Sequence, residues 1–168
     1  MYHVLTHVLG CLEELNRSRD LAKDADAIRL ALWFHDAVWE PARPDNEEAS
    51  AALADSALSA ASVPGPRRQA VHALILATRH DRVPEGPDAR LIADIDLCIL
   101  GADPDDYDRY ERAVRREYGQ LSDETFASGR AAFAAGMLAR PRIYATGRYF
   151  RRLEAAARAN LARSARLA

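Results

Sequence analysis

The segment Ile28-Arg29-Leu30-Ala31-Leu32-Trp33-Phe34-His35-Asp36-Ala37-Val38-Trp39 indicates the kind of fold that this chain adopts. Its apolar side chains recur every three or four residues, as in a helix that buries one face. His35 belongs to that apolar face, and Asp36 follows it directly. A carboxylate is costly to bury in such a helix unless it is paired or bound to a cation. The segment therefore predicts a buried helix, continuing to Trp39, that carries a polar site.

The same helical periodicity extends through the rest of the chain. All eight prolines lie where the periodicity stops or starts, as expected if proline is excluded from helix interiors. No alternation typical of strands is found between turn residues. The expected helices span about residues 3–17, 25–39, 47–61, 66–80, 89–100, 104–118, 123–139 and from 141 onward. Local signals mark several of their ends: Asp24 or Asp26 can cap the second helix, Gly101 suits the position after the fifth, Pro104 the first turn of the sixth, and Ser122 the start of the seventh. The sequence thus predicts an all-α fold, a compact single-domain bundle of about seven or eight helices over residues 1–168.

Composition excludes several classes of function. The net charge of −2 provides no general attraction to a nucleic-acid polymer or an anionic membrane. From Arg140 to the end there are eight arginines and one acid, which we interpret first as a solvated helical face. No basic leader and no apolar run of about 18 residues is present, so neither secretion nor a membrane span is expected. Cys11 and Cys98 lie in apolar segments without CxxC spacing, which predicts buried thiols and a cytoplasmic location.

Side chains suited to binding a metal occur before and after the His35-Asp36 pair. His7 lies on the first expected helix, and Asp94 and Asp96 lie on the fifth. Two imidazoles and two carboxylates are a plausible ligand set for a divalent ion and leave coordination positions open for water. Asp94 and Asp96 project about 200° apart on a helix, so only one of them is expected to face the ion. The helical pattern by itself does not decide between them.

Two further histidines bear on the number of ions. On one continuous helix, His72 and His80 would be about 12 Å apart along the axis, too far to hold the same ion. We therefore predict a site for one divalent metal ion, with Mn, Fe, Co, Ni, Zn and Mg all compatible with the ligand types.

The ordered set of His7, His35-Asp36 and an aspartate at position 94 or 96 resembles the H…HD…D signature of the HD-domain superfamily of metal-dependent phosphohydrolases. Further stretches are similar to a small bacterial branch of predicted phosphohydrolases within it. They are residues 2–8, 33–39, 45–51, 94–101, 114–118 and 154–161. Members of the branch normally carry another helix and an arginine before the pair Tyr2-His3. The resemblance thus implies an HD-domain-like fold whose first helix is missing here.

The resemblance assigns His7, His35 and Asp36 as metal ligands. An alanine before the final aspartate is common in the family and favours Asp94, whereas the distance to Gly101 favours Asp96. The aspartate that is not a ligand would orient a ligand histidine.

The same resemblance implies roles in catalysis and substrate binding. Asp36 and Glu47 are candidates to accept a proton. The candidates for substrate contact are His3, Asn46, Arg79 and His80. A structural role is equally compatible with His3, one helical turn before His7, and helix N-capping explains Asn46 equally well.

The function that the resemblance implies is hydrolysis of a small phosphorylated metabolite, such as a nucleotide, by a metal-activated water. The second hypothesis is a di-iron HD-like oxygenase, which requires a second metal and more ligands. The third is a non-catalytic module that binds a metal or ligand. A homodimer through the Arg-rich and Tyr-rich C-terminal helices is left open.

Overall fold

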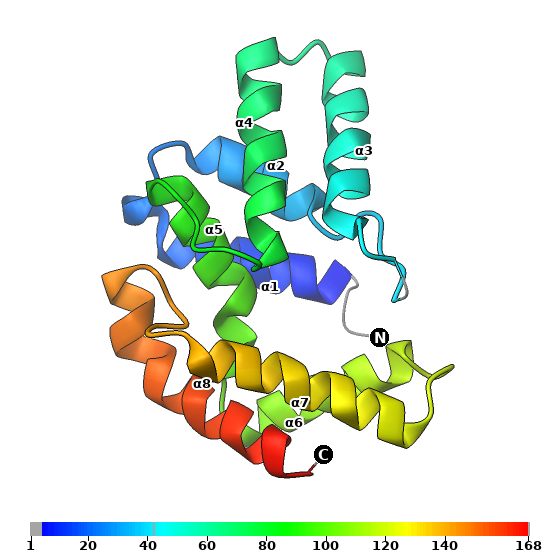
Figure 1. The fold of residues 1–168 in the computed structure, drawn as a ribbon. Coiled ribbons are helices and arrows are strands. Elements are labelled where there is room, and N and C mark those ends of the chain that lie inside the picture. Colours follow the sequence, from blue (N-terminus) through cyan, green and yellow to red (C-terminus); the bar gives the residue numbers. More distant parts are fainter. Residues whose placement is uncertain (1–4, 42, 168) are drawn as a thin grey trace. The chain divides into compact units, whose positions relative to one another are not determined.

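The computed structural model describes residues 5–41 and 43–167, which form eight α-helices, three short 3₁₀ helices and no β-strand (Figure 1). The all-α prediction of seven or eight helices is confirmed. The chain divides into two compact units, one ending at Asp96 and the other beginning at Leu97. The single-domain organisation stays a prediction, and each unit is described separately.

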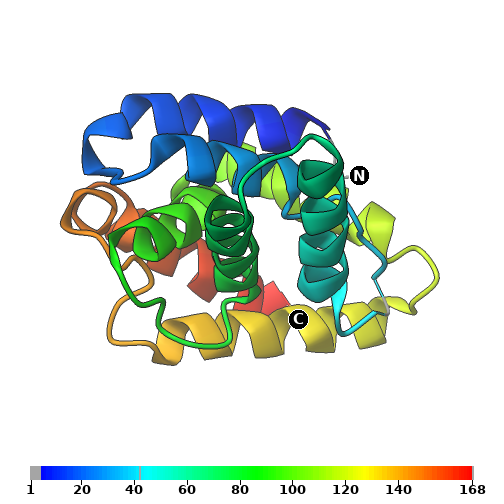
Figure 2. The same ribbon diagram turned by 90° about the horizontal axis from the view of Figure 1, so that it is seen from above.

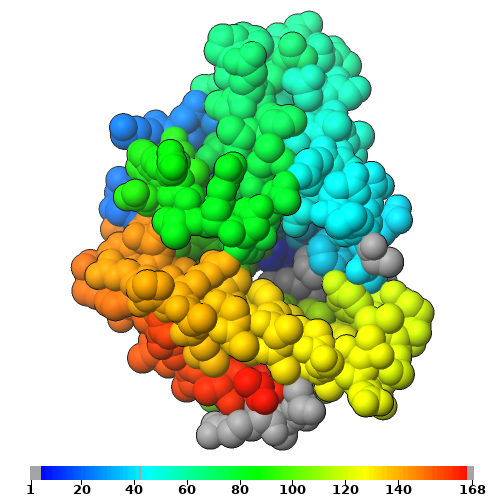
Figure 3. Space-filling model, viewed as in Figure 1, coloured from blue at the N-terminus to red at the C-terminus, as the bar shows by residue number. Residues whose placement is uncertain are grey.

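The first unit contains five α-helices. They are α1 (Leu5–Arg17), α2 (Ala25–Phe34), α3 (Asn46–Ala60), α4 (Gly65–Leu76) and α5 (Pro87–Asp96), with the 3₁₀ helices η1 (Arg19–Leu21) after α1 and η2 (Ala77–Arg79) after α4. Helices α1 and α2 lie side by side (Figure 2). Helices α3 and α4 form an antiparallel hairpin, and the space-filling view shows their atoms in contact along it (Figure 3).

The core of the first unit is aliphatic and drawn from all five α-helices. Its fully buried large side chains are Leu15, Ile28, Leu32, Ile75, Leu91, Ile92 and Ile95. Alanines such as Ala31 and Ala51 are also buried and let the helix backbones approach closely. This core holds α1, α2 and α5 together, and these three helices position the polar residues His7, His35 and Asp96.

Helix α2 begins as the sequence indicates but ends five residues earlier than expected. Asp24 is its N-cap, because its Oδ1 accepts a hydrogen bond of 2.9 Å from the Ala27 amide. The expected continuation to Trp39 is wrong, since α2 ends at Phe34. The residues after Phe34 form a turn, in which the Ala37 amide donates to the Phe34 carbonyl.

Side chains of α3 hold the segment after α2 in its non-helical course. The buried Ser50 hydroxyl accepts from the Val38 amide at 3.0 Å and donates to the Val38 carbonyl at 3.2 Å. The side-chain amide of Asn46 accepts from the Glu40 N–H and donates to the carbonyls of Glu40 and Arg43. These tertiary bonds compete with helix propagation. Asn46 is also the first residue of α3, with Asp45 in the N-cap position that the sequence favoured for Asn46.

The second unit contains three α-helices and one 3₁₀ helix. They are η3 (Leu97–Gly101), α6 (Pro104–Glu117), α7 (Asp123–Ala139) and α8 (Gly147–Leu167). Pro104 lies in the first turn of α6, and Ser122 caps α7 through a 3.2 Å bond from the Thr125 amide, as predicted.

The expected helix 89–100 is wrong over its last four residues, where the chain tightens into η3 after Asp96. Gly101 has a packing role there rather than that of a helix cap. A Cβ at Gly101 would lie 2.6 Å from the Leu153 Cβ, closer than packed side chains allow. Glycine therefore permits η3 to approach α8.

The last helix begins at Gly147, so the expectation that Pro141 opens it is also wrong. Its carboxylate Glu154 explains the difference. The Ile143 and Tyr144 amides donate to Glu154 at 3.1 to 3.2 Å, and Arg158 Nε donates at 2.8 Å. The backbone amides of residues 143 and 144 thus donate to a buried carboxylate instead of to helical carbonyls.

Two sequence expectations concern thiols and membranes. Cys11 is buried as predicted, whereas the prediction is wrong for Cys98, which is only half-buried, and neither cysteine forms a disulfide. Among the helices of the described residues, none combines the length and apolar character needed to cross a membrane.

Candidate metal centre

Three helices of the first unit bring two histidines and two aspartates to one place. His7 lies on α1, His35 and Asp36 directly follow α2, and Asp96 is the last residue of α5. The Nε2 atoms of His7 and His35 are 3.1 Å apart. Asp96 Oδ1 lies 3.1 Å from His7 Nε2 and 3.4 Å from His35 Nε2. Side chains separated by up to 89 positions therefore converge.

The spacing of these atoms fits a ligand set around one ion. Within the described part of the chain, His7, His35 and Asp96 form the group of potential ligands whose atoms all lie within 4.8 Å of one another. Two atoms each bound about 2.1 Å from an ion are about 3.0 Å apart at an octahedral angle and about 3.4 Å apart at a tetrahedral one. The observed separations of 3.1 to 3.4 Å match this range.

Asp36 brings a second carboxylate close to the two imidazoles, although it is not one of the three residues whose ligand atoms all lie within 4.8 Å of one another. Its Oδ2 lies 3.1 Å from His35 Nε2 and 3.5 Å from His7 Nε2. The side chains of Asp36 and Asp96 are 14% and 15% exposed, whereas His35 is 1% exposed. The imidazoles thus form the buried floor of the cluster, and the carboxylates form its more accessible side.

The orientation of the His35 ring is fixed by a backbone contact. Its Nδ1 lies 2.9 Å from the Leu32 carbonyl oxygen, which can only accept, so Nδ1 carries the proton. In the neutral ring, Nε2 then presents a lone pair toward His7 and the two aspartates. A backbone partner on one ring nitrogen is the usual arrangement for a histidine that binds a metal with the other.

The electrostatics of the cluster are set by burial and by unlike charges. Burial alone would lower the pKa of His35, but Asp36 and Asp96 outweigh it and raise that pKa well above its ordinary value. Burial would likewise raise the pKa of Asp96, yet hydrogen bonds from His35, His7 and His80 hold it well below its usual range. The unlike charges thus favour the ionised form of Asp96 and the protonated form of His35.

The structure distinguishes the two late aspartates, which the sequence left open. Asp96 faces the histidines from the end of α5. Asp94 is 1% exposed on another side of the helix and is not in the close group of ligand atoms. Asp96 is accordingly the aspartate that the structure brings to His7 and His35.

The residues predicted to act on substrate lie in different surroundings. Glu47 is half-buried, and burial raises its pKa, to which the charges of Asp36 and Glu48 add. Asn46 uses its amide in the loop after α2, as described above. Arg79 is exposed and pairs with Glu48 and with Asp81.

Of the remaining candidates, His80 donates from Nε2 to Asp96 Oδ2 at 2.7 Å, so it contacts the cluster through a carboxylate. His72 is exposed on α4. His3 lies outside the described residues.

Cys11 is a neighbour of the cluster that the sequence analysis did not predict. Its Sγ lies 3.7 Å from both ring nitrogens of His7. The signal was present, because position 11 follows position 7 by one helical turn on the same face. The buried thiol packs against the His7 ring and restricts its orientation.

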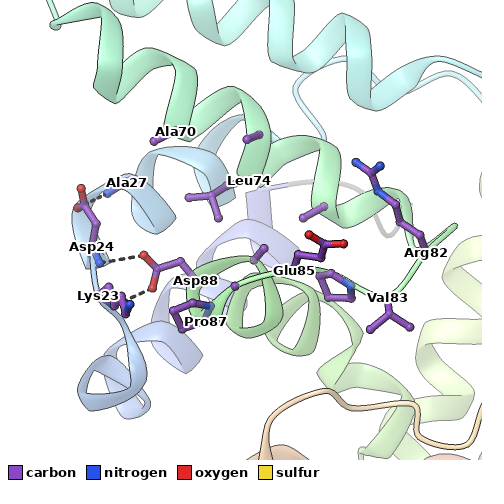
Figure 4. A pocket seen from close by; sticks show the side chains of 15 residues that line it. Lys23, Asp24, Ala27, Ala70, Leu74, Arg82, Val83, Glu85, Pro87 and Asp88 are labelled. Atoms are coloured by element: carbon purple, nitrogen blue, oxygen red, sulfur yellow. Dashed lines mark hydrogen bonds between the residues drawn. The ribbon is translucent and has the colours of Figure 1, made fainter.

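A pocket of about 480 Å³ lies elsewhere in the first unit (Figure 4). It lies between α4, which contributes Leu74, and the segment 82–89, and Asp88 at its edge accepts hydrogen bonds from the Lys23 and Asp24 amides at 2.7 and 3.0 Å. None of the four cluster residues lines it. Its volume suits a small molecule, but the metal-binding chemistry is not in this pocket.

Fold and site together define an all-α protein with a buried cluster of two histidines and two aspartates. Comparison of the chain with protein-family models, with curated proteins and with solved structures finds no match. The case for a function therefore rests on the sequence signature and on the geometry of the cluster.

Proposed function

We propose that this chain is a metal-dependent phosphohydrolase of the HD-domain type, which acts on a small phosphorylated metabolite such as a nucleotide. The observation that carries the proposal is the convergence of His7, His35, Asp36 and Asp96, with ligand atoms 3.1 to 3.5 Å apart. These are the residue types, in the same order, that the H…HD…D signature requires. Both the spacing and the donor set fit one divalent ion.

His7, His35, Asp36 and Asp96 would hold that ion. A divalent ion there would supply Lewis-acid chemistry, lowering the pKa of water toward neutrality and polarising a phosphoryl oxygen. The two imidazoles fix the ligand directions from the buried side. The carboxylates are more exposed than the imidazoles, so a substrate would approach the cluster from their side.

Glu47 is the residue best placed to handle a proton near the cluster. It lies in the first turn of α3, close enough to Asp36 for the charges to interact, and burial raises its pKa. A carboxylate whose pKa moves toward neutrality is a more effective general base at physiological pH. Glu47 is therefore proposed to accept a proton from the attacking water, and Asp36 to serve as a ligand.

A phosphate-release screen tests the proposal. Purified protein is freed of metal, reloaded separately with Mn, Fe, Co, Ni, Zn or Mg, and offered nucleotides and sugar phosphates. We expect release with at least one metal, loss of it in Asp36→Ala, and a decrease of about 10²- to 10⁴-fold in kcat in Glu47→Gln. Asp55→Asn, which changes an exposed acid on α3 outside the cluster, is the matched control and should retain activity.

Equal phosphate release by wild-type protein and Asp36→Ala would overturn the proposed site. Metal analysis of the purified protein distinguishes the other hypotheses. Two ions per chain would favour the di-iron oxygenase, and a bound ion without hydrolysis of any phosphorylated compound would favour the binding module.

A further inference from the structure

The carboxylate of Asp96 is divided between two partners. Its Oδ1 faces His7 and His35 at 3.1 and 3.4 Å, and its Oδ2 accepts a hydrogen bond of 2.7 Å from His80 Nε2. A carboxylate can bind an ion through one oxygen or through both. A donor held on the second oxygen selects the first mode.

His80 reaches Asp96 from a backbone conformation that few residues adopt. It has φ 57° and ψ 18°, in the left-handed region, and directly follows η2. Among the described residues other than glycine, only Ser62 shares a positive φ. Such conformations are unfavourable for residues with a Cβ and recur at functional sites, where surrounding contacts maintain them.

Neighbouring contacts fix this conformation at the end of the α4 and η2 segment. The buried Thr78 hydroxyl donates to the Ile75 carbonyl at 2.7 Å. Arg79 pairs with Glu48 on α3 and with Asp81. The turn is therefore anchored on both sides of His80, and the imidazole is directed to the last residue of α5.

His80 is not arranged as a third histidine ligand. Its close partner is the Asp96 oxygen that does not face the other two rings. A role through Asp96 fits these contacts, whereas direct binding of the same ion does not.

We infer that His80 is a positioning residue, which holds Oδ2 of Asp96 so that Oδ1 alone is presented to the metal. This inference rests on the metal centre of the proposed function but not on its phosphohydrolase activity. It assigns His80 a role in setting metal affinity and coordination, in place of the substrate contact that the sequence analysis favoured.

Metal binding by purified full-length protein tests the inference. His80→Asn keeps a residue that tolerates the left-handed conformation but is too short to reach Asp96. We expect a 10- to 100-fold loss of Co²⁺ and Zn²⁺ affinity, roughly the effect of removing an outer partner of a ligand. His80→Gln, whose amide nitrogen reaches about as far as Nε2, should lose less than about fivefold. His72→Asn, on the exposed face of α4, should bind as wild type.

The visible absorption of bound Co²⁺ supplies a second readout that a purely structural role would not change. We expect the bands of His80→Asn at saturating Co²⁺ to shift, because freeing Oδ2 lets Asp96 bind through both oxygens. His80→Gly, which adopts a left-handed backbone without cost, replaces the asparagine variant if that variant fails to fold.

The outcomes separate this inference from the proposed function. Unchanged affinity and an unchanged Co²⁺ spectrum in His80→Asn or His80→Gly would overturn it, even if the enzyme hydrolyses phosphate. Failure of the wild type to bind any metal would overturn the metal centre and the role of His80 together. Metal binding that depends on His80 in a protein without hydrolytic activity would support the inference and contradict only the proposed reaction.

Discussion

Two buried carboxylate sites, one in each unit, are satisfied in different ways. In the second unit, Glu154 receives hydrogen bonds from the Ile143 and Tyr144 amides and from Arg158. Each of these donors carries a permanent hydrogen, so the chain itself neutralises and solvates the acid. Nothing further is required for that site to be stable, and its role is structural.

The cluster in the first unit is built from groups whose protonation is variable. The Nε2 atoms of His7 and His35 face each other across 3.1 Å. Two neutral lone pairs at that distance repel unless a proton or a cation lies between them. Burial of a carboxylate does not by itself indicate function. The type of partner does, and the histidine partners here favour a cation.

The largest expected effect concerns stability at the Glu154 site. Glu154→Ala should lower the free energy of unfolding by about 3–5 kcal/mol, because it leaves buried amides and Arg158 without their acceptor. Glu154→Gln, which retains one acceptor oxygen, should cost clearly less. Urea unfolding of the three proteins measures the difference, and a loss below about 1 kcal/mol in Glu154→Ala would contradict the structural role.

The next effect concerns metal binding at the cluster. His35→Ala removes a direct ligand and should weaken divalent-metal affinity more than about 100-fold, beyond the range for outer partners. Isothermal titration with Zn²⁺ or Co²⁺ measures it, with His72→Ala as the control. Equal affinity in His35→Ala and wild type would show that the cluster is not a metal site.

A smaller effect follows from linkage between metal binding and folding. Metal at about 100 times its dissociation constant should stabilise the native state by about 2.7 kcal/mol, or raise the melting temperature by about 5–10 °C. Glu154→Gln should have a lower melting temperature without metal but the same metal-induced rise. His35→Ala should show no metal-induced rise. A metal-induced rise that survives in His35→Ala would place the ion elsewhere.

The smallest effect is the pH dependence of the metal-free protein. The raised pKa of His35 contributes stability below about pH 6.5 that is lost as the pH rises through its folded-state value. The lowered pKa of Asp96 contributes stability above about pH 3.9 that is lost as the pH falls through its folded-state value. Unfolding in chelator should therefore show lower stability at pH 9 than at pH 6.

The variant His35→Gln tests the cause of that alkaline loss. It should remove most of the difference between pH 6 and pH 9, whereas His72→Gln should preserve it. Metal affinity should change in the opposite sense and rise with pH, since the ligands must lose their protons.

The existence of the helices was predicted better than the residues at which they begin and end. Local signals were sufficient at Asp24, Pro104 and Ser122, where capping side chains and proline act within a few residues. They failed at the end of α2 and the start of α8. There the deciding partners, Ser50 and Glu154, lie 11 to 12 residues away and bond the backbone in place of the helix.

The candidate site divides in the same way. His7, His35 and Asp36 were predicted from their types and order to form one site, and the structure brings their side chains together. Their binding of a metal stays a prediction. The choice of Asp96 over Asp94 was not recognised, since both lie on one helix and only its packing decides which side faces the histidines.

The sequence by itself determined that the chain is helical and where most of its helices begin, because periodicity and capping are local properties. Tertiary structure alone decided that Asp96 faces His7 and His35 and that His80 binds the other oxygen of Asp96. These contacts join residues 16 to 89 positions apart, and their geometry depends on how α1, α2 and α5 pack.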